Sequence, residues 1–221
     1  MHKQIGELII SYIALILAIS VHECSHAWTA NRFGDPTAKN LGRMTLNPLA
    51  HIDLLGTVLI PLFIIISGSN ILFGWAKPVP VNPYNLRNPK KGSLWVSFSG
   101  PLSNMVLAIT AAVIYHLAGF IPGGVFFAQE WFFIFKPLIL IVIFTIQLNI
   151  ILAVFNLIPI FPLDGSGILM GILPAGKAIL FEKTKPYGFL ILLFLFYTGI
   201  LGTILSPVYF TLINFLRVPI F

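Results

Sequence analysis

The residues most able to do chemistry in this chain are His22, Glu23 and His26, which form a His-Glu-x-x-His motif. Two histidines four positions apart lie on one face of a helix, where a single metal ion can bind both rings. The glutamate beside them can act as a base toward a water that the metal activates. The pattern therefore predicts a metal-dependent hydrolytic site, and zinc is a metal that accepts these ligands.

This motif lies within an apolar stretch, Ile9 to Trp28, that is long enough to cross a bilayer. An ionisable side chain near the bilayer centre costs about 2.5 to 3.5 kcal/mol on insertion scales, so such groups usually mark a functional site. The alternative is that the three side chains cap a helix or pair with one another at the membrane surface. That alternative leaves three costly groups in five positions without a shared purpose.

A catalytic zinc site usually has three protein ligands and keeps one position for water or substrate. The only three aspartates are Asp35, Asp53 and Asp164. Asp35 follows the first apolar segment in a helix breaker and is expected to be a solvated turn residue or a cap, and Asp53 is expected to be a helix cap. Asp164 is framed by prolines and a glycine that would break the helix and direct its carboxylate toward the bundle, which makes it the best candidate for the third ligand. Its alternative role is to cap a helix over Ser166 to Leu173.

Composition places the chain among integral membrane proteins. Of its 221 residues, 57% are hydrophobic and 9% are charged, and the mean hydropathy is +0.95. We expect a single transmembrane domain, residues 1–221, because no stretch is polar enough to form a separate soluble domain. The net charge of +6 is dispersed among apolar residues, which favours positively charged loops at a membrane and not a nucleic-acid partner.

Four long apolar segments and one interrupted segment must position the candidate metal-binding residues. The interrupted one contains Pro61 and a Ser-Gly-Ser-Asn break. The five ranges are Gly6–Phe33, Ile52–Phe73 (the interrupted one), Leu94–Ile121, Trp131–Leu157 and Tyr187–Leu205. They predict an all-α polytopic membrane protein with about four to five transmembrane helices. A tail after Ser206-Pro207 is expected to be a kinked continuation or a separate interfacial piece.

The topology is constrained because Asp164 must reach the two histidines. The histidines lie toward the end of the first segment and Asp164 lies just after the fourth, so the two segments must run in the same direction. An odd number of crossings must then separate them, and the interrupted segment, residues 52–73, is expected to be re-entrant. The basic residues then gather on one side, which the positive-inside rule makes cytoplasmic. We therefore expect the site to open toward the cytoplasm.

Taken together, these motifs resemble the site-2 protease family of intramembrane zinc metalloproteases. The resemblance rests on His22-Glu23-x-x-His26 in the first segment, Leu163-Asp164-Gly165 after a later one, Gly100-Pro101-x-x-Asn104, and Asn156 eight residues before Asp164. Residues 73–83 are similar to a loop of the compact bacterial and archaeal branch that lacks PDZ and CBS domains. The resemblance implies one Zn²⁺ per chain, a prokaryotic inner membrane, and hydrolysis of peptide bonds in or near a transmembrane segment of a membrane-protein substrate.

Two asparagines are candidates for contacts with substrate. Asn104 and Asn156 could orient the substrate backbone or stabilise an oxyanion, because an amide offers a donor and an acceptor without a charge to desolvate. Hydrogen bonding between helices is the alternative for each. Cys24 is expected to be a small buried helix residue, and His51 and His116 are expected to lie outside the site.

The stretch Ala38 to Leu46 could form a short hairpin at the membrane edge. A protease must bind its substrate in an extended conformation, and such an edge could pair with that substrate by strand addition. An ordinary interfacial loop is the alternative for this stretch.

Two other classes of function remain open from the sequence. In the first, a metal-ion transporter or channel, Glu23→Gln would retain function, and ions would cross a membrane that contains the protein. In the second, the chain is an inactive relative that serves as a membrane scaffold.

Overall fold

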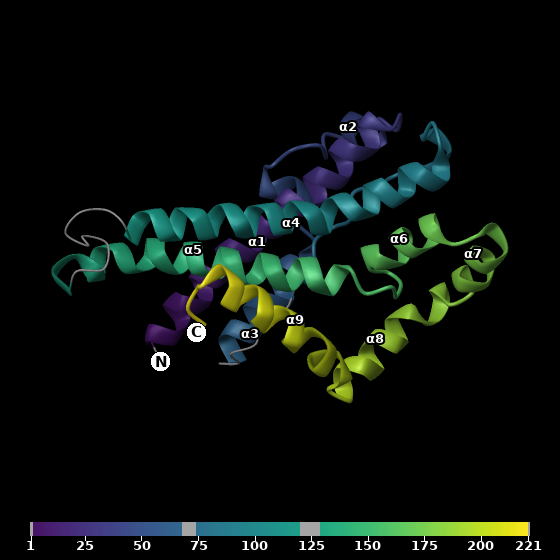
Figure 1. Ribbon diagram of the computed structural model, residues 1–221. Helices are drawn as coiled ribbons and strands as arrows, with labels where there is room; N and C mark the ends of the chain where they lie inside the picture. The colour runs from purple at the N-terminus through teal and green to yellow at the C-terminus, as the bar shows by residue number, and fades with distance from the viewer. Residues whose placement is uncertain (1, 68–73, 120–128, 221) are drawn as a thin grey trace.

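The computed structural model describes residues 2–67, 74–119 and 129–220, and these residues contain helices and no strand (Figure 1). The all-α prediction is confirmed. The α-helices in chain order are α1 (His2–Arg32), α2 (Thr37–Asn40), α3 (Ile60–Ser67), α4 (Pro89–Gly119), α5 (Gln129–Asn156), α6 (Asp164–Ile172), α7 (Ala175–Glu182), α8 (Gly188–Tyr197) and α9 (Ile200–Leu216).

Three helical stretches are long and apolar enough to cross a membrane. They are Gly6–Arg32 within α1, Pro89–Gly119, which is α4, and Phe135–Asn156 within α5. A further pair, Ala175–Tyr197 and Ile200–Leu216, is bent by 77° and passes the same test only when taken together. The described residues therefore contain three spans, or four if the bent pair is one span, at the low end of the four to five expected.

Helices α1, α4 and α5 pack side by side to form the centre of the protein (Figure 1). His26 contacts Val96 and His22 contacts Asn104, so α4 runs antiparallel to α1. Helix α5 runs parallel to α1, because Glu7 near the start of α1 pairs with Lys136 on α5 and the chain leaves α5 close to the two histidines. This is the relative direction that the sequence argument requires. Close packing is favoured by small residues, and the three helices carry eight buried alanines: Ala14, Ala18, Ala27, Ala30, Ala108, Ala111, Ala112 and Ala153.

The parts of the chain that precede and follow the interrupted segment lie close together. The amide of Lys77 donates to the carbonyl of His51 at 3.0 Å, and the amide of Trp75 donates to the carbonyl of Gly56 at 3.2 Å. The chain therefore enters and leaves this segment at one place, as a re-entrant hairpin requires. Asp53 caps its first helical turn, as expected, by accepting from the amides of Leu55 and Gly56. The Ser-Gly-Ser-Asn break falls partly on residues 68–73, which lie outside the described residues.

Residues 38–46 do not form the hairpin suggested by the sequence, and this prediction is wrong. They contain the end of α2 followed by turns, and all of them are described. The amides of Asn40 and Arg43 donate to the carbonyls of Pro36 and Ala38 at 2.9 Å. Because these donors are satisfied by local carbonyls, they are not available to a partner strand.

The C-terminal break also differs from the prediction. The sequence placed it at Ser206-Pro207, whereas α8 ends before Gly199, which has a φ of +74°, and Pro207 lies inside α9. A left-handed backbone ends a helix readily at glycine. A proline within a helix at membrane depth is tolerated when neighbouring groups satisfy the freed carbonyl.

Helix α6 positions Asp164 by packing tightly against α4. A Cβ atom at Gly167 would lie 2.1 Å from the Ser97 Oγ, and one at Gly171 would lie 2.5 Å from the Leu94 Cβ. Asp164 is the first residue of α6, with Leu163 as the N-cap and no side-chain capping bond. Its carboxylate is therefore directed toward α1, which leads to the site described next.

Candidate metal centre

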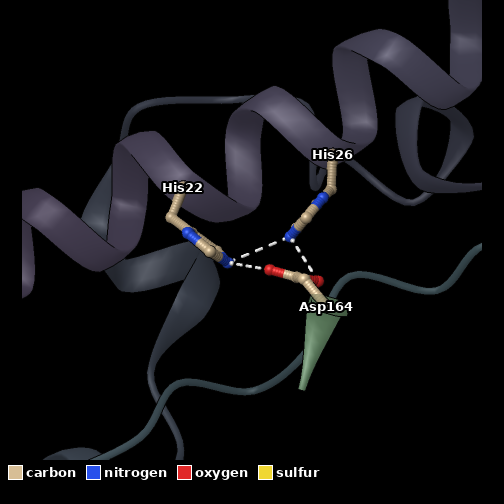
Figure 2. Close-up of side chains that lie close together, drawn as sticks. All are labelled: His22, His26 and Asp164. Atoms are coloured by element: carbon tan, nitrogen blue, oxygen red, sulfur yellow. Dashed lines mark hydrogen bonds and ion pairs between the residues drawn. The ribbon is translucent and has the colours of Figure 1, made fainter. Parts of the chain in front are cut away.

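Three side chains from two helices converge on one point, as Figure 2 shows. The Nε2 atoms of His22 and His26 lie 3.0 Å apart. The carboxylate of Asp164 places one oxygen 3.0 Å from His22 Nε2 and the other 3.3 Å from His26 Nε2. The ligand atoms of the three residues all lie within 4.8 Å of one another.

The outer nitrogen of each ring is held by an oxygen. The Nδ1 of His22 lies 2.5 Å from the Asn104 Oδ1, and the Nδ1 of His26 lies 2.7 Å from the carbonyl of Val96. Because these oxygens can only accept, each Nδ1 must carry the hydrogen. Each neutral ring then presents an Nε2 lone pair to the other ring and to Asp164, which is the arrangement of histidines that bind a metal.

The residues present fit a zinc ion. Ligand atoms at about 2.0 to 2.1 Å from a tetrahedral zinc lie about 3.3 Å from one another, close to the 3.0 and 3.3 Å separations in this cluster. The Asp164 Oδ2 is buried and has no hydrogen-bond donor among the described residues. Three electron-rich atoms that face one another without a shared hydrogen repel unless a cation lies between them.

A glycine allows α4 to approach the rings. A Cβ atom at Gly100 would lie 2.5 Å from the Cε1 and Nε2 of His26 and 2.6 Å from the Cε1 of His22. Any larger side chain would occupy the space of the two imidazoles. The glycine of the Gly-Pro-x-x-Asn motif is therefore explained by its close approach to the two imidazole rings.

A cavity of about 350 Å³ opens onto the three residues. Glu23 lies on its wall, and the Oε2 of Glu23 accepts a hydrogen bond of 2.7 Å from the amide of Val79. The wall combines the end of α1 with the start of α4, the end of α5 and a non-helical segment. The remaining lining residues are Pro78, Val79, Val81, Pro83, Ser93, Val96, Ser97, Asn156 and Pro162.

The two asparagines predicted to contact substrate occupy different places. Asn156 lines the cavity, and its amide nitrogen donates to the carbonyl of Leu152 at 3.0 Å. Asn104 has no exposed surface and lies behind His22, away from the cavity. His51 and His116 bond the carbonyls of Thr45 and Leu216, outside the cluster.

The segment that walls the cavity was not identified from the sequence as part of the site. It runs without helix from Gly74 to Asn82 and is held by Asp35, which accepts from the amide of Asn82 at 2.7 Å and from the Asn85 side chain at 2.9 Å. Asp35 also accepts from Thr37. It is fully buried, so the expectation of a solvated residue was wrong, although its cap-like contact with Thr37 is present. Burial raises the pKa of Asp35, but these hydrogen bonds outweigh burial and lower the pKa overall.

Several known proteins have sequences similar to this one. The sequence matches Peptidase family M50 over residues 10–198. It is 38% identical to the "Putative zinc metalloprotease YwhC" of Bacillus subtilis (strain 168), over 88% of this chain and 83% of that protein. It is 28% identical to the "Putative zinc metalloprotease Rip2" of Mycolicibacterium smegmatis, over 90% of this chain and 71% of that protein. No solved structure matches the chain.

Apolar helices of spanning length, a buried cluster of two histidines and a carboxylate, and these relatives define a membrane zinc metalloprotease. The chain belongs to peptidase family M50, the site-2 proteases. Its cofactor is Zn²⁺.

Proposed function

We propose that this protein is an intramembrane protease that cleaves membrane-protein substrates in or near a transmembrane segment, with one zinc ion held by His22, His26 and Asp164. The observation that carries the proposal is the convergence of these ligand atoms at a cavity near the end of a spanning helix. Glu23, on the wall of the same cavity, supplies the base that the chemistry needs.

Zinc bound by these residues would supply a Lewis acid that makes water a nucleophile near neutral pH. Glu23 accepts the proton of that water as its oxygen adds to the scissile carbonyl carbon. Glu23 then gives the proton to the amide nitrogen as the carbon–nitrogen bond breaks. Glu23 is held in place by the amide of Val79, so its carboxylate faces the cavity before substrate arrives.

The substrate must enter this cavity unwound, because a helix uses its own carbonyls and amides for hydrogen bonding and shields the scissile bond. Residues 74–82 lack helix and place Pro78, Val79 and Val81 on the cavity wall. An extended substrate could lie against this wall. The amides of Trp75, Lys77, Val79 and Asn82 already have acceptors, so we propose that this segment contacts substrate through its side chains and carbonyls and does not form a pairing strand.

The asparagines take different roles in this proposal. Asn156 lines the cavity and is placed to contact a substrate carbonyl or the oxyanion that forms from it. Asn104 contacts the outer nitrogen of His22, so we propose that it orients this ring and does not touch substrate.

The charges support a site that opens toward the cytoplasm of a prokaryotic cell. Arg32 ends α1, and Lys90 and Lys91 lie in the first turn of α4. Because the two helices are antiparallel, these cations share the end of the bundle that holds the cluster. The positive-inside rule assigns such an end to the cytoplasm.

Co-expression with candidate single-span membrane proteins tests the proposal. The wild type is expected to release a truncated product, and Glu23→Gln is expected to release none while it keeps the size and zinc content of the wild type. Ion flux in proteoliposomes serves as the control, because a transporter would carry zinc in both forms. Equal truncation by the wild type and Glu23→Gln would contradict a protease that uses Glu23.

A further inference from the structure

We propose that Asn149 on α5 is a positioning residue for the zinc site, and that it fixes the orientation and tautomer of His22 through the Asn104 side chain. The inference rests on the proposed function in one respect, since it takes His22 as a zinc ligand. Asn149 itself lies one helix away from that ligand and lines no part of the cavity described above.

The hydrogen bonds can be assigned in one direction only. The carbonyl of Thr145 can only accept, so the Asn149 Nδ2, 2.7 Å away, must face it. The Asn149 Oδ1 is therefore directed toward the Asn104 Nδ2, at 2.6 Å, and that nitrogen also donates to the carbonyl of Ala18 at 3.2 Å. The Asn104 Oδ1 is left facing the Nδ1 of His22 at 2.5 Å. A backbone carbonyl of α5, acting through Asn149 and together with the carbonyl of Ala18 on α1, thus favours a hydrogen on the Nδ1 of His22.

Both asparagines in this series of hydrogen bonds are buried, which makes a wrongly turned amide costly. Asn104 and Asn149 are both 0% exposed, so water cannot replace a partner that is turned the wrong way. If the Asn104 amide rotated by half a turn, its nitrogen would face the Nδ1 of His22. Its oxygen would face two acceptors, the Asn149 Oδ1 and the Ala18 carbonyl. His22 could then keep its contact with Asn104 only by moving its hydrogen to Nε2, the atom that zinc needs bare.

The two histidines differ in what holds them. His26 bonds directly to the backbone carbonyl of Val96, which cannot rotate independently of α4. His22 bonds to a side chain that can rotate, and the orientation of that side chain depends on the Asn149 oxygen at 2.6 Å as well as on the Ala18 carbonyl at 3.2 Å. Loss of Asn149 should therefore weaken zinc binding through His22 alone.

The chain offers a matched control on the same helix. Gln147 is also a buried amide of α5, and its nitrogen donates to the carbonyl of Pro219 at 2.9 Å, away from the cluster. Replacing either residue by leucine removes a buried amide from α5. Only the change at Asn149 removes the partner of Asn104.

The test measures zinc affinity of the purified full chain by competition with a chelator. Removal of a residue that orients a ligand typically weakens metal binding 10- to 100-fold, so Asn149→Leu is expected to weaken it by about 10-fold or more. Gln147→Leu is expected to stay within about 2-fold of the wild type. In an Asn104→Asp background a carboxylate oxygen faces His22 in either orientation, so Asn149→Leu should have little further effect.

Wild-type affinity in Asn149→Leu, together with loss of zinc in His26→Ala, would overturn the inference and leave the proposed site intact. Zinc retained in His26→Ala would instead overturn the proposed site. If Asn149→Leu fails to fold, a measurement on the wild type still tests the inference. NMR spectra of zinc-free protein with isotope-labelled histidine should show a hydrogen on the Nδ1 of His22, with or without a second one on Nε2, and a hydrogen on Nε2 alone would refute the inference.

Discussion

Replacing Gly100 by alanine should disrupt the proposed zinc site although no proposed ligand is replaced. The added methyl would lie 2.5 Å from His26 and 2.6 Å from His22, whereas ordinary contact begins at 3.4 Å. Either α4 must move away from α1 by about 0.9 Å or the rings must rotate, and a displacement of this size is enough to impair a preorganised site. We expect overpacking to cost about 1 to 3 kcal/mol of stability and zinc affinity to fall by about 10-fold or more.

The assay combines zinc content, thermal unfolding and cleavage of a membrane-protein substrate. Gly119→Ala on the same helix is the control, because a Cβ atom at Gly119 would have nothing within 4 Å. The control should keep wild-type zinc content and activity. If Gly100→Ala also binds zinc and cleaves like the wild type, the packing of α4 against the two histidines is not as described.

Three further predictions concern the ligands, the loop anchor and the topology. Asp164→Ala should lower zinc content well below one ion per chain while Glu23→Gln retains it, as metal analysis of the purified proteins would show. Asp35→Asn should destabilise the protein by about 1 to 3 kcal/mol, because it replaces one buried acceptor oxygen by a donor. The pKa of Asp35 is lowered by its hydrogen bonds despite burial, so the wild type loses this advantage as the pH falls below about 4, and unfolding curves of the two proteins should converge there. Single cysteines at Asn40 and Asn88, in an otherwise cysteine-free protein, should label from the same membrane face; labelling from opposite faces would exclude the re-entrant segment.

The three residues that lie together in the candidate site could be predicted from local sequence. His22 and His26 share one face because residues four positions apart do so in any helix, and the prolines and glycine around Asp164 indicated a helix break that directs its carboxylate toward the bundle. The structure brings these three residues together, and their role as zinc ligands stays a prediction. The direction of the fourth segment followed from the need to join residues that are 138 or more positions apart in the chain.

What the sequence missed depends on contacts between distant segments. Asp35 looked like an exposed turn residue because its partners, Asn82 and Asn85, are far along the chain. The sequence left Asn104 between a contact with substrate and a hydrogen bond between helices, because nothing local shows that its side chain faces His22 from behind. The C-terminal break was assigned to a proline, whereas the left-handed Gly199 ends α8, since proline in a membrane helix is a weaker signal than it is in water.

The measurement that tests the central claim most directly is cleavage by the purified protein reconstituted in lipid vesicles with a single-span substrate. Mass spectrometry of the products would locate the cut. We predict one cut in or beside the transmembrane segment, lost when zinc is removed by a chelator, restored when zinc is returned, and absent throughout in Glu23→Gln. Cleavage that persists without zinc, or that occurs equally in Glu23→Gln, would contradict the account.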